Sequence, residues 1–190
     1  MRTIAVYTLG CKVNQYDTEA MLELFERAGY VSAPFDSEAD IYLINTCTVT
    51  GTGDQKSLKT VRRVARLHPD CAIIVCGCLA QRLADEILKM DNVRLVLGVT
   101  KRGQVVELIE RALNENTRIN AVETLKNAPF EKLAVSRHEG KTRATMKIQE
   151  GCDRWCTYCI IPSVRGPIRS RPVDEIAAEA RSLAEAGFRE

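Results

Sequence analysis

The sequence contains no apolar run approaching the roughly 18 residues that a membrane-spanning helix needs. Its opening segment, MRTIAVYTLGCKVNQYD, has only a short apolar stretch before it turns polar. This pattern favours a first core strand over a secretory signal. We therefore expect a cytoplasmic protein without a membrane partner.

The chain also lacks a large charge of one sign. Its 27 Lys and Arg residues against 25 Asp and Glu give a formal net charge of +2, so global charge does not indicate a nucleic-acid-binding protein. Two local basic groups stand out, and a solvated surface explains the second at least as well as a binding role does. They are Arg165, Arg169 and Arg171, and, at helical spacing, Lys59, Arg62, Arg63 and Arg66.

The length of 190 residues allows one α/β domain of ordinary size and something smaller, but not two complete enzymatic domains. The hydrophobic content of 45% and the charged content of 27% are typical of soluble globular proteins with a packed core. Any large second domain is therefore expected to be incomplete.

Apolar segments alternate with amphipathic ones up to about residue 115. This alternation is typical of repeated strand and helix units in an α/β fold with a doubly wound, mostly parallel sheet. We expect residues 1–115 to form such a domain. The expected strands are 3–9, 40–45, 72–76 and 93–97, and the expected helices are 17–28, 54–67, 81–89 and 101–113.

The periodicity fades between residues 116 and 141, where polar residues, Pro129 and Gly140 favour a linker or an extended crossing segment. Beyond it, a strand is expected at 144–148 and a helix at 173–186. One strand, one loop and one helix do not close a domain. Residues 142–190 are therefore expected to be the start of a second, truncated domain.

Eight cysteines in a chain without an export signal indicate metal ligation or redox chemistry rather than a disulfide framework. Cys152, Cys156 and Cys159, here called the loop cysteines, form a CxxxCxxC motif in GCDRWCTYC. Three thiolates on a short loop can bind three irons of a 4Fe-4S cube and leave the fourth iron open for an external ligand. Trp155 and Tyr158 within the loop are expected to shield this cluster or to line a cofactor pocket.

Zinc and disulfide alternatives fit the loop cysteines less well. A structural zinc site needs a fourth ligand and usually has paired CxxC knuckles, which this spacing does not provide. His138 could supply a fourth ligand, but it lies in a polar stretch fourteen residues before Cys152. A disulfide is disfavoured in a reducing compartment.

Three other cysteines, here called the strand-end cysteines, follow the first three expected strands: Cys11, Cys47 and Cys78. Because loops at the carboxyl ends of parallel strands converge on one crevice, we expect these thiols to meet in space. Each lies in a short polar or glycine-bearing turn, where the backbone can approach a bulky inorganic cluster. A purely structural role is the alternative, since free cysteines are common in cores.

The remaining cysteines, Cys71 and Cys76, are expected to be core residues because one begins a strand and the other lies within it. Asn14 and Asn45 lie near the strand ends. They could donate hydrogen bonds toward a cluster, but turn formation is an equally good reason for an asparagine at these positions.

Two cysteine triads in this arrangement resemble the methylthiotransferase branch of the radical S-adenosylmethionine (radical-SAM) enzymes. The similarity is strongest to the MtaB-type subgroup, which acts on threonylcarbamoyladenosine in tRNA. It covers essentially the whole chain, whereas a CxxxCxxC motif alone would indicate only a radical-SAM enzyme. The matching strings are TLGCKVNQYD, INTCTVT, CGCLAQ, KIQEGCDRWCTYCIIPSVRGPIRSR and LAEAGFRE.

The resemblance implies a role for each triad. The loop cysteines would be catalytic and bind a 4Fe-4S cluster whose open iron chelates the amino and carboxylate groups of SAM, with Tyr158 near the adenine of SAM. The strand-end cysteines would hold an auxiliary 4Fe-4S cluster. The implied ligands of the two clusters are Cys11, Cys47, Cys78, Cys152, Cys156 and Cys159.

The implied reaction is methylthiolation of C2 of N6-threonylcarbamoyladenosine next to the anticodon, by way of a 5′-deoxyadenosyl radical from SAM. The implied partners are the tRNA anticodon loop, SAM, a reductant such as flavodoxin or ferredoxin, and a sulfur donor. The family normally continues through a partial β/α barrel and an RNA-binding β domain. The chain is thus expected to be an N-terminal fragment, inactive alone; the alternative is a stand-alone iron-sulfur binding or electron-transfer module.

Overall fold

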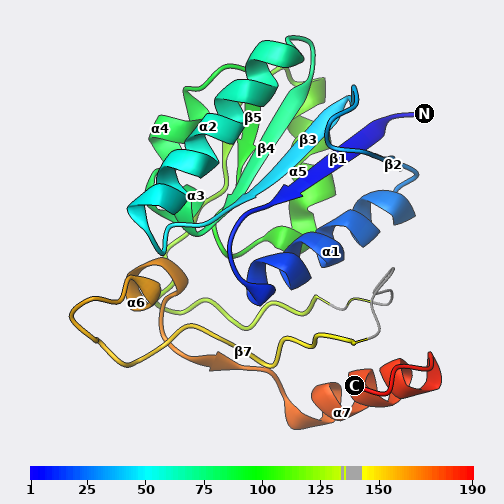
Figure 1. The fold of residues 1–190 in the computed structure, drawn as a ribbon, viewed down its shortest axis with the longest axis vertical. Helices are drawn as coiled ribbons and strands as arrows, with labels where there is room; N and C mark the ends of the chain where they lie inside the picture. Colours follow the sequence, from blue (N-terminus) through cyan, green and yellow to red (C-terminus); the bar gives the residue numbers. More distant parts are fainter. Residues whose placement is uncertain (134, 136–142) are drawn as a thin grey trace.

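Six parallel strands form the main sheet of the protein, in the order β2-β1-β3-β4-β5-β6 (Figure 1). The structure is a computed structural model that describes residues 1–133, 135 and 143–190. It confirms the expected α/β fold. The strands are β1 (Thr3–Thr8), β2 (Val31–Ala33), β3 (Ile41–Thr46), β4 (Ala72–Gly77), β5 (Val93–Val96) and β6 (Ile119–Asn120).

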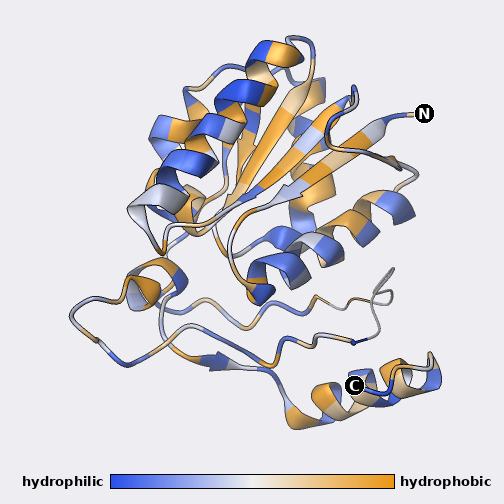
Figure 2. Ribbon diagram, in the orientation of Figure 1, coloured by the Kyte–Doolittle hydropathy of each residue, from blue (hydrophilic) through white to orange (hydrophobic). Residues whose placement is uncertain are grey.

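Helices cover both faces of this sheet. Apolar residues alternate between the faces: Ile4 of β1 packs with Phe25 and Ile109, whereas its neighbour Ala5 packs with Val61. Every residue of β3 and β4 is buried, as expected for central strands with helices on both sides, and Figure 2 shows these strands as the apolar centre of the fold. One face carries α1 (Lys12–Arg27) and α5 (Val105–Asn114), and the other carries α2 (Gly51–Leu67), α3 (Cys78–Arg82) and α4 (Ala84–Leu88).

The helices differ from the sequence prediction at their starts. Helix α1 begins at Lys12, directly after Cys11, rather than at residue 17. The LGCKVNQ segment, predicted as a turn, is therefore mostly helical. Helix α2 begins at Gly51 rather than near residue 54, because Thr50 caps it by accepting a hydrogen bond from the Gly53 amide.

Two predicted helices are divided in the structure. The segment 81–89 belongs to α3 and α4, which meet at Leu83. The segment 101–113 starts with a 3₁₀ turn, η1 (Arg102–Gln104), before α5. In both places an amphipathic stretch long enough for one helix is divided between two helical elements.

Residues 143–190, here called the second segment, lie against the carboxyl edge of the sheet, with α6 (Ile161–Arg165) packed on α3 (Figure 1). The strand predicted at 144–148 is wrong. Pairing is confined to β7 and β8, which are antiparallel, because a ladder extends only where a neighbouring backbone offers partners. The elements of the second segment are β7 (Gln149–Glu150), α6 (Ile161–Arg165), β8 (Arg169–Ser170) and α7 (Val173–Glu185).

The segment predicted as a linker contains β6, the last strand of the sheet, and the buried residues Ala121 and Leu125. Gly140, also assigned to this segment, lies outside the described residues. The domain boundaries at 115 and 141 stay predictions. Within the described ranges, no helix combines the length and the apolar character needed to cross a bilayer.

Candidate metal centre at the carboxyl edge of the sheet

The structure brings the strand-end cysteines to one edge of the sheet. Strand register pairs Thr8 with Asn45 and Thr46 with Gly77, so β1, β3 and β4 end side by side. Cys47 and Cys78 follow the second of these pairs directly. A Cβ atom placed on Gly10, the neighbour of Cys11, would lie 3.1 Å from the Cys47 Sγ. Three residues far apart in the sequence thus surround one small region.

The three thiols differ in exposure and in backbone setting. Cys78 is 3% exposed, Cys47 is half-buried and Cys11 is exposed. Cys11 is the N-cap of α1, and Cys78 is the first residue of α3. Both residues therefore lie where a helix starts at the carboxyl edge of the sheet.

Arg165, from α6, contacts the most buried of these thiols. Its Nε donates to the Cys78 Sγ at 3.3 Å, and its Nη2 donates to the Asn14 Oδ1 at 2.6 Å. Burial raises the pKa of Cys78, the nearby guanidinium lowers it, and the charges of Cys47 and Cys11 raise it again. The repulsion among the three sulfurs reflects their proximity.

The two asparagines hold the strand ends together. The Asn14 Nδ2 donates to the carbonyls of Leu9 and Thr46, at 2.8 and 2.9 Å, and the Asn45 Nδ2 donates to the Asn14 carbonyl at 3.0 Å. These donors are therefore used by the backbone rather than directed at a cluster, and they join distant segments instead of forming local turns. The Asn14 Oδ1 lies 3.8 Å from the Cys11 Sγ and faces Arg165.

The loop cysteines lie at the surface, between β7 and α6. Cys156 is exposed, and Cys152 and Cys159 are half-buried. The Arg154 amide donates to the Cys152 Sγ at 3.4 Å, and the Cys159 amide donates to the Cys156 carbonyl at 3.0 Å. Hydrogen bonds to the ligating sulfurs are a feature of protein-bound iron-sulfur clusters, so this loop suits metal ligation.

The two aromatic residues of the loop are highly exposed, with 76% of Trp155 and 90% of Tyr158 accessible. Side chains of this size bury a large apolar area when they find a partner. The expectation that they shield a cluster or line a cofactor pocket stays a prediction. The zinc alternative depended on His138, which lies outside the described residues.

No group of three or more His, Cys, Asp or Glu side chains within the described ranges is close enough to hold a single metal ion. In a 4Fe-4S cube, by contrast, each thiolate binds a different iron, so the ligands surround a volume rather than a point. Both triads fit that donor chemistry: three cysteines each, with a cation or a backbone N–H directed at one sulfur.

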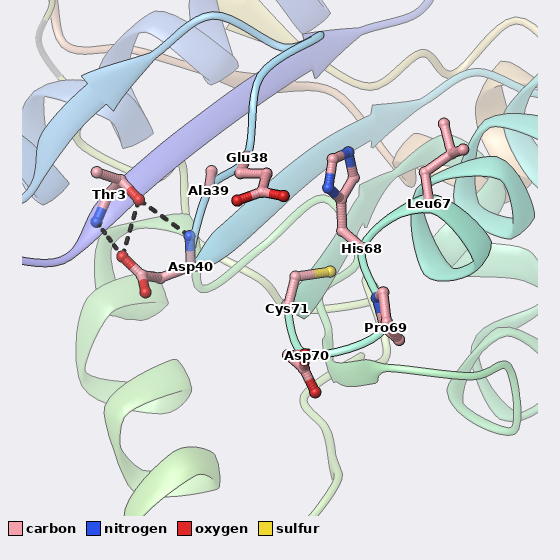
Figure 3. Close-up of a pocket in the computed structure, with 9 residues that line it drawn as sticks. All are labelled: Thr3, Glu38, Ala39, Asp40, Leu67, His68, Pro69, Asp70 and Cys71. Carbon is pink, nitrogen blue, oxygen red and sulfur yellow. Dashed lines mark hydrogen bonds between the residues drawn. The ribbon is translucent and has the colours of Figure 1, made fainter.

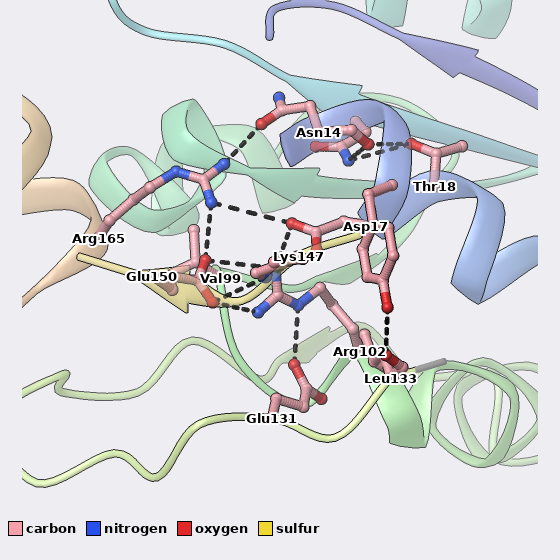
Figure 4. Close-up of polar contacts among 12 residues, drawn as sticks. Asn14, Asp17, Thr18, Val99, Arg102, Glu131, Leu133, Lys147, Glu150 and Arg165 are labelled. Atoms are coloured by element: carbon pink, nitrogen blue, oxygen red, sulfur yellow. Dashed lines mark hydrogen bonds and ion pairs between the residues drawn. The ribbon is translucent and has the colours of Figure 1, made fainter. Parts of the chain in front are cut away.

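A buried ionic network adjoins the strand-end cysteines and was missed by the sequence analysis. Arg102 pairs with Asp17 and, at 2.9 Å, with Glu150 (Figure 4). Lys147 bridges the same two carboxylates at 2.8 and 2.9 Å, and Arg165 reaches Glu150 at 2.7 Å. Burial would raise the pKa of Glu150, but these cations together lower it to about 2. No sequence signal marks these charges, because charged side chains are usually solvated.

Cys71 and Cys76 are buried core residues, as expected. Burial raises the pKa of Cys71 to about 11 and that of Cys76 further, so both thiols stay protonated at neutral pH. Cys71 lines an open cavity of about 380 Å³ with Thr3, Asp40 and His68 (Figure 3). This cavity lies where β1, β3 and β4 begin, at the opposite edge from the strand-end cysteines.

Comparison with known proteins finds relatives that match the whole chain. A family model described as uncharacterized protein family UPF0004 matches residues 3–98. The threonylcarbamoyladenosine tRNA methylthiotransferase MtaB of Bacillus subtilis (strain 168) is 46% identical, over 100% of this chain and 42% of that protein. MtaB of Thermotoga maritima is 36% identical, over 100% and 43%. The ribosomal protein uS12 methylthiotransferase RimO of Synechococcus sp. (strain WH7803) is also 36% identical, over 99% and 40%.

The chain spans less than half the length of these relatives. Among solved structures, a response regulator from Thermotoga maritima covers 60% of this chain at 15% identity, with a TM-score of 0.43. A likeness at that level does not indicate function.

Proposed function

The chain belongs to the methylthiotransferase family, and we propose that it provides the two iron-sulfur sites of a radical-SAM enzyme that methylthiolates threonylcarbamoyladenosine in tRNA. One observation carries this proposal: the folding of the sheet gathers Cys11, Cys47 and Cys78, while a separate loop presents Cys152, Cys156 and Cys159. Two trios of thiols are what two cubes with one open iron each require.

The residues divide the work between the two sites. When bound, the clusters and SAM would supply the radical that removes hydrogen from an aromatic carbon and the sulfur that replaces it, chemistry that no side chain can perform. The loop cysteines would hold one cluster at the surface, where SAM can reach it, and exposed Tyr158 would contact the adenine. The strand-end cysteines would hold the other where Cys78 is shielded from water.

The substrate proposal comes from the relatives. A relative that is 46% identical is named for threonylcarbamoyladenosine in tRNA, and relatives of 35% and 36% identity are named for dimethylallyladenosine in tRNA and for ribosomal protein uS12. We therefore place the tRNA anticodon loop first among substrates, with a reductant such as flavodoxin or ferredoxin and a sulfur donor as further partners. The cytoplasm is the expected compartment.

Anaerobic reconstitution with iron and sulfide tests the two sites. We expect about eight irons per chain, two cubes of four. Cys11→Ala should lose about half of this iron and keep the loop cluster, and Cys152→Ala should lose the other half. Cys71→Ala is the matched control, because this buried thiol lies at the other edge of the sheet. If Cys11→Ala kept as much iron as the unaltered chain, the assignment of the strand-end cysteines would be wrong.

A second assay separates the enzyme from a stand-alone iron-sulfur module. The reconstituted chain, reduced with dithionite and supplied with SAM, should release 5′-deoxyadenosine if the loop cluster is catalytic. Two clusters without SAM cleavage would favour an electron-transfer module. Zinc without iron or sulfide in the isolated chain would contradict both.

A further inference from the structure

Arg165 connects the second segment of the chain to the strand-end cysteines. On the basis of the proposed function, we infer that Arg165 is a positioning residue for the auxiliary cluster. Arg165 supplies a cationic N–H donor to the sulfur of Cys78. Its guanidinium contacts three groups at once: the Cys78 Sγ at 3.3 Å, the Asn14 Oδ1 at 2.6 Å and the Glu150 Oε1 at 2.7 Å. Figure 4 shows the side chain directed toward Asn14 and Glu150.

The backbone around Arg165 is fixed by packing. Val164 belongs to a buried apolar cluster with Cys78, Val99 and Leu125. Arg165 itself is 5% exposed, and its carbonyl accepts a hydrogen bond from the Arg169 Nη2 at 3.0 Å. The guanidinium is thus held at the cysteine by its contacts with Asn14 and Glu150.

Among the residues that the structure describes, the charges around Arg165 are unbalanced in favour of cations. The linked pairs of these residues contain four cations against three carboxylates, which leaves one positive charge in excess. The Nε and Nη1 of Arg169 are buried without an acceptor in the part of the chain that the structure describes. The cations are Arg102, Lys147, Arg165 and Arg169, and the carboxylates are Asp17, Glu131 and Glu150.

A buried cation in excess is unfavourable unless an anion lies nearby. A cluster bound through three thiolates would provide that anion at the position where Arg165 ends. A positive charge and a hydrogen bond at a ligating sulfur stabilise the reduced, more negative state of a cluster, and so raise its reduction potential. Arg165 also follows Cys159 by six residues, so one short segment contacts both sites.

The test measures the auxiliary cluster alone. In the full chain with Cys152, Cys156 and Cys159 all changed to Ala, iron can bind only at the strand-end cysteines. The cluster's midpoint potential is then measured by EPR-monitored reductive titration. Arg165→Gln should shift it to more negative values, and Arg165→Lys, which keeps the charge but not the Nε donor, should shift it by less. Arg171→Gln is the matched control, because Arg171 pairs with Glu179 on α7 and its loss should leave the potential unchanged.

An unchanged potential in Arg165→Gln would overturn the inference. If circular dichroism shows that this variant does not fold, Arg165→Lys decides in the same way, because it preserves the charge balance of the buried network. A parent chain that binds no iron at the strand-end cysteines would instead overturn the proposed function. The two failures are therefore distinguishable.

Discussion

Gly77 lets β4 pass directly into α3 at the edge where the strand-end cysteines gather. Its φ is +94°, and a Cβ atom there would lie 2.3 Å from the Asn45 Oδ1 and 2.5 Å from the Thr46 carbonyl oxygen. Both the backbone angle and the space require glycine. Because Cys78 is the next residue, this glycine determines where the buried thiol lies.

Replacing Gly77 by alanine should destabilise the protein by about 3 kcal/mol or more, since it adds a backbone clash to an unfavourable φ. Gly29→Ala is the matched control: its φ is +87°, but nothing lies within 4 Å of the added Cβ. It should cost only about 1–2 kcal/mol. Urea denaturation measures both, and equal losses would show that the clash at Gly77 relaxes.

At the residue scale, the sequence was most informative about cysteines. The placement of Cys11, Cys47 and Cys78 at one edge could be predicted because parallel strands share a direction. The position of Arg165 could not be predicted, since an arginine in a polar loop is compatible with a cofactor carboxylate, with RNA or with solvent. Only packing against α3 directs it to Cys78.

At the element scale, the four predicted strands of the sheet are all present, because short apolar runs flanked by polar residues favour buried strands. Helix starts were predicted less well. Asn14 and Asp17, polar residues that interrupt the expected apolar pattern of α1, are buried and bonded to distant groups. The short β2 and β6 depend on their neighbours in the sheet and carry little local signal.

The 3₁₀ turn η1 joins three elements through Arg102, which pairs with Asp17 of α1 and with Glu150 of β7. Arg102→Ala would leave these buried carboxylates with fewer counter-charges, so we expect a loss of about 3–5 kcal/mol in the free energy of unfolding. Arg63→Ala breaks an exposed pair with Asp36 and should change stability by only about 0.5 kcal/mol. Comparable urea midpoints for the two variants would contradict this account.

At the scale of the whole molecule, Tyr16 connects α1, one of the helices that cover the sheet, to segments that follow the sheet in the sequence. Its hydroxyl donates to the Leu133 carbonyl at 2.6 Å and lies 3.3 Å from the Glu179 Oε1 on α7. Burial is the main reason that the pKa of Tyr16 is raised, followed by the charge of Glu179. The phenol therefore stays neutral and able to donate at physiological pH.

Tyr16→Phe should loosen α7 without unfolding the sheet. Loss of one buried hydrogen bond of about 1 kcal/mol predicts roughly fivefold faster amide exchange in α7 and unchanged exchange in β3 and β4. Tyr30→Phe is the matched control, because the Tyr30 hydroxyl donates to Glu110 of α5, a helix that covers the sheet. Hydrogen-exchange mass spectrometry measures amide exchange in both variants. Equal protection of α7 in Tyr16→Phe and in the unaltered protein would show that the Tyr16 hydroxyl does not hold α7 in place.

The charged character of the buried network has a consequence for synthesis. Asp17 and Arg102 leave the ribosome well before Lys147, Glu150 and Arg165, which complete their surroundings. Until those residues are synthesised, this face of the nascent chain exposes hydrated charged groups rather than apolar side chains. A partly synthesised chain would thus be less prone to aggregate through the surface that later forms the buried ionic network.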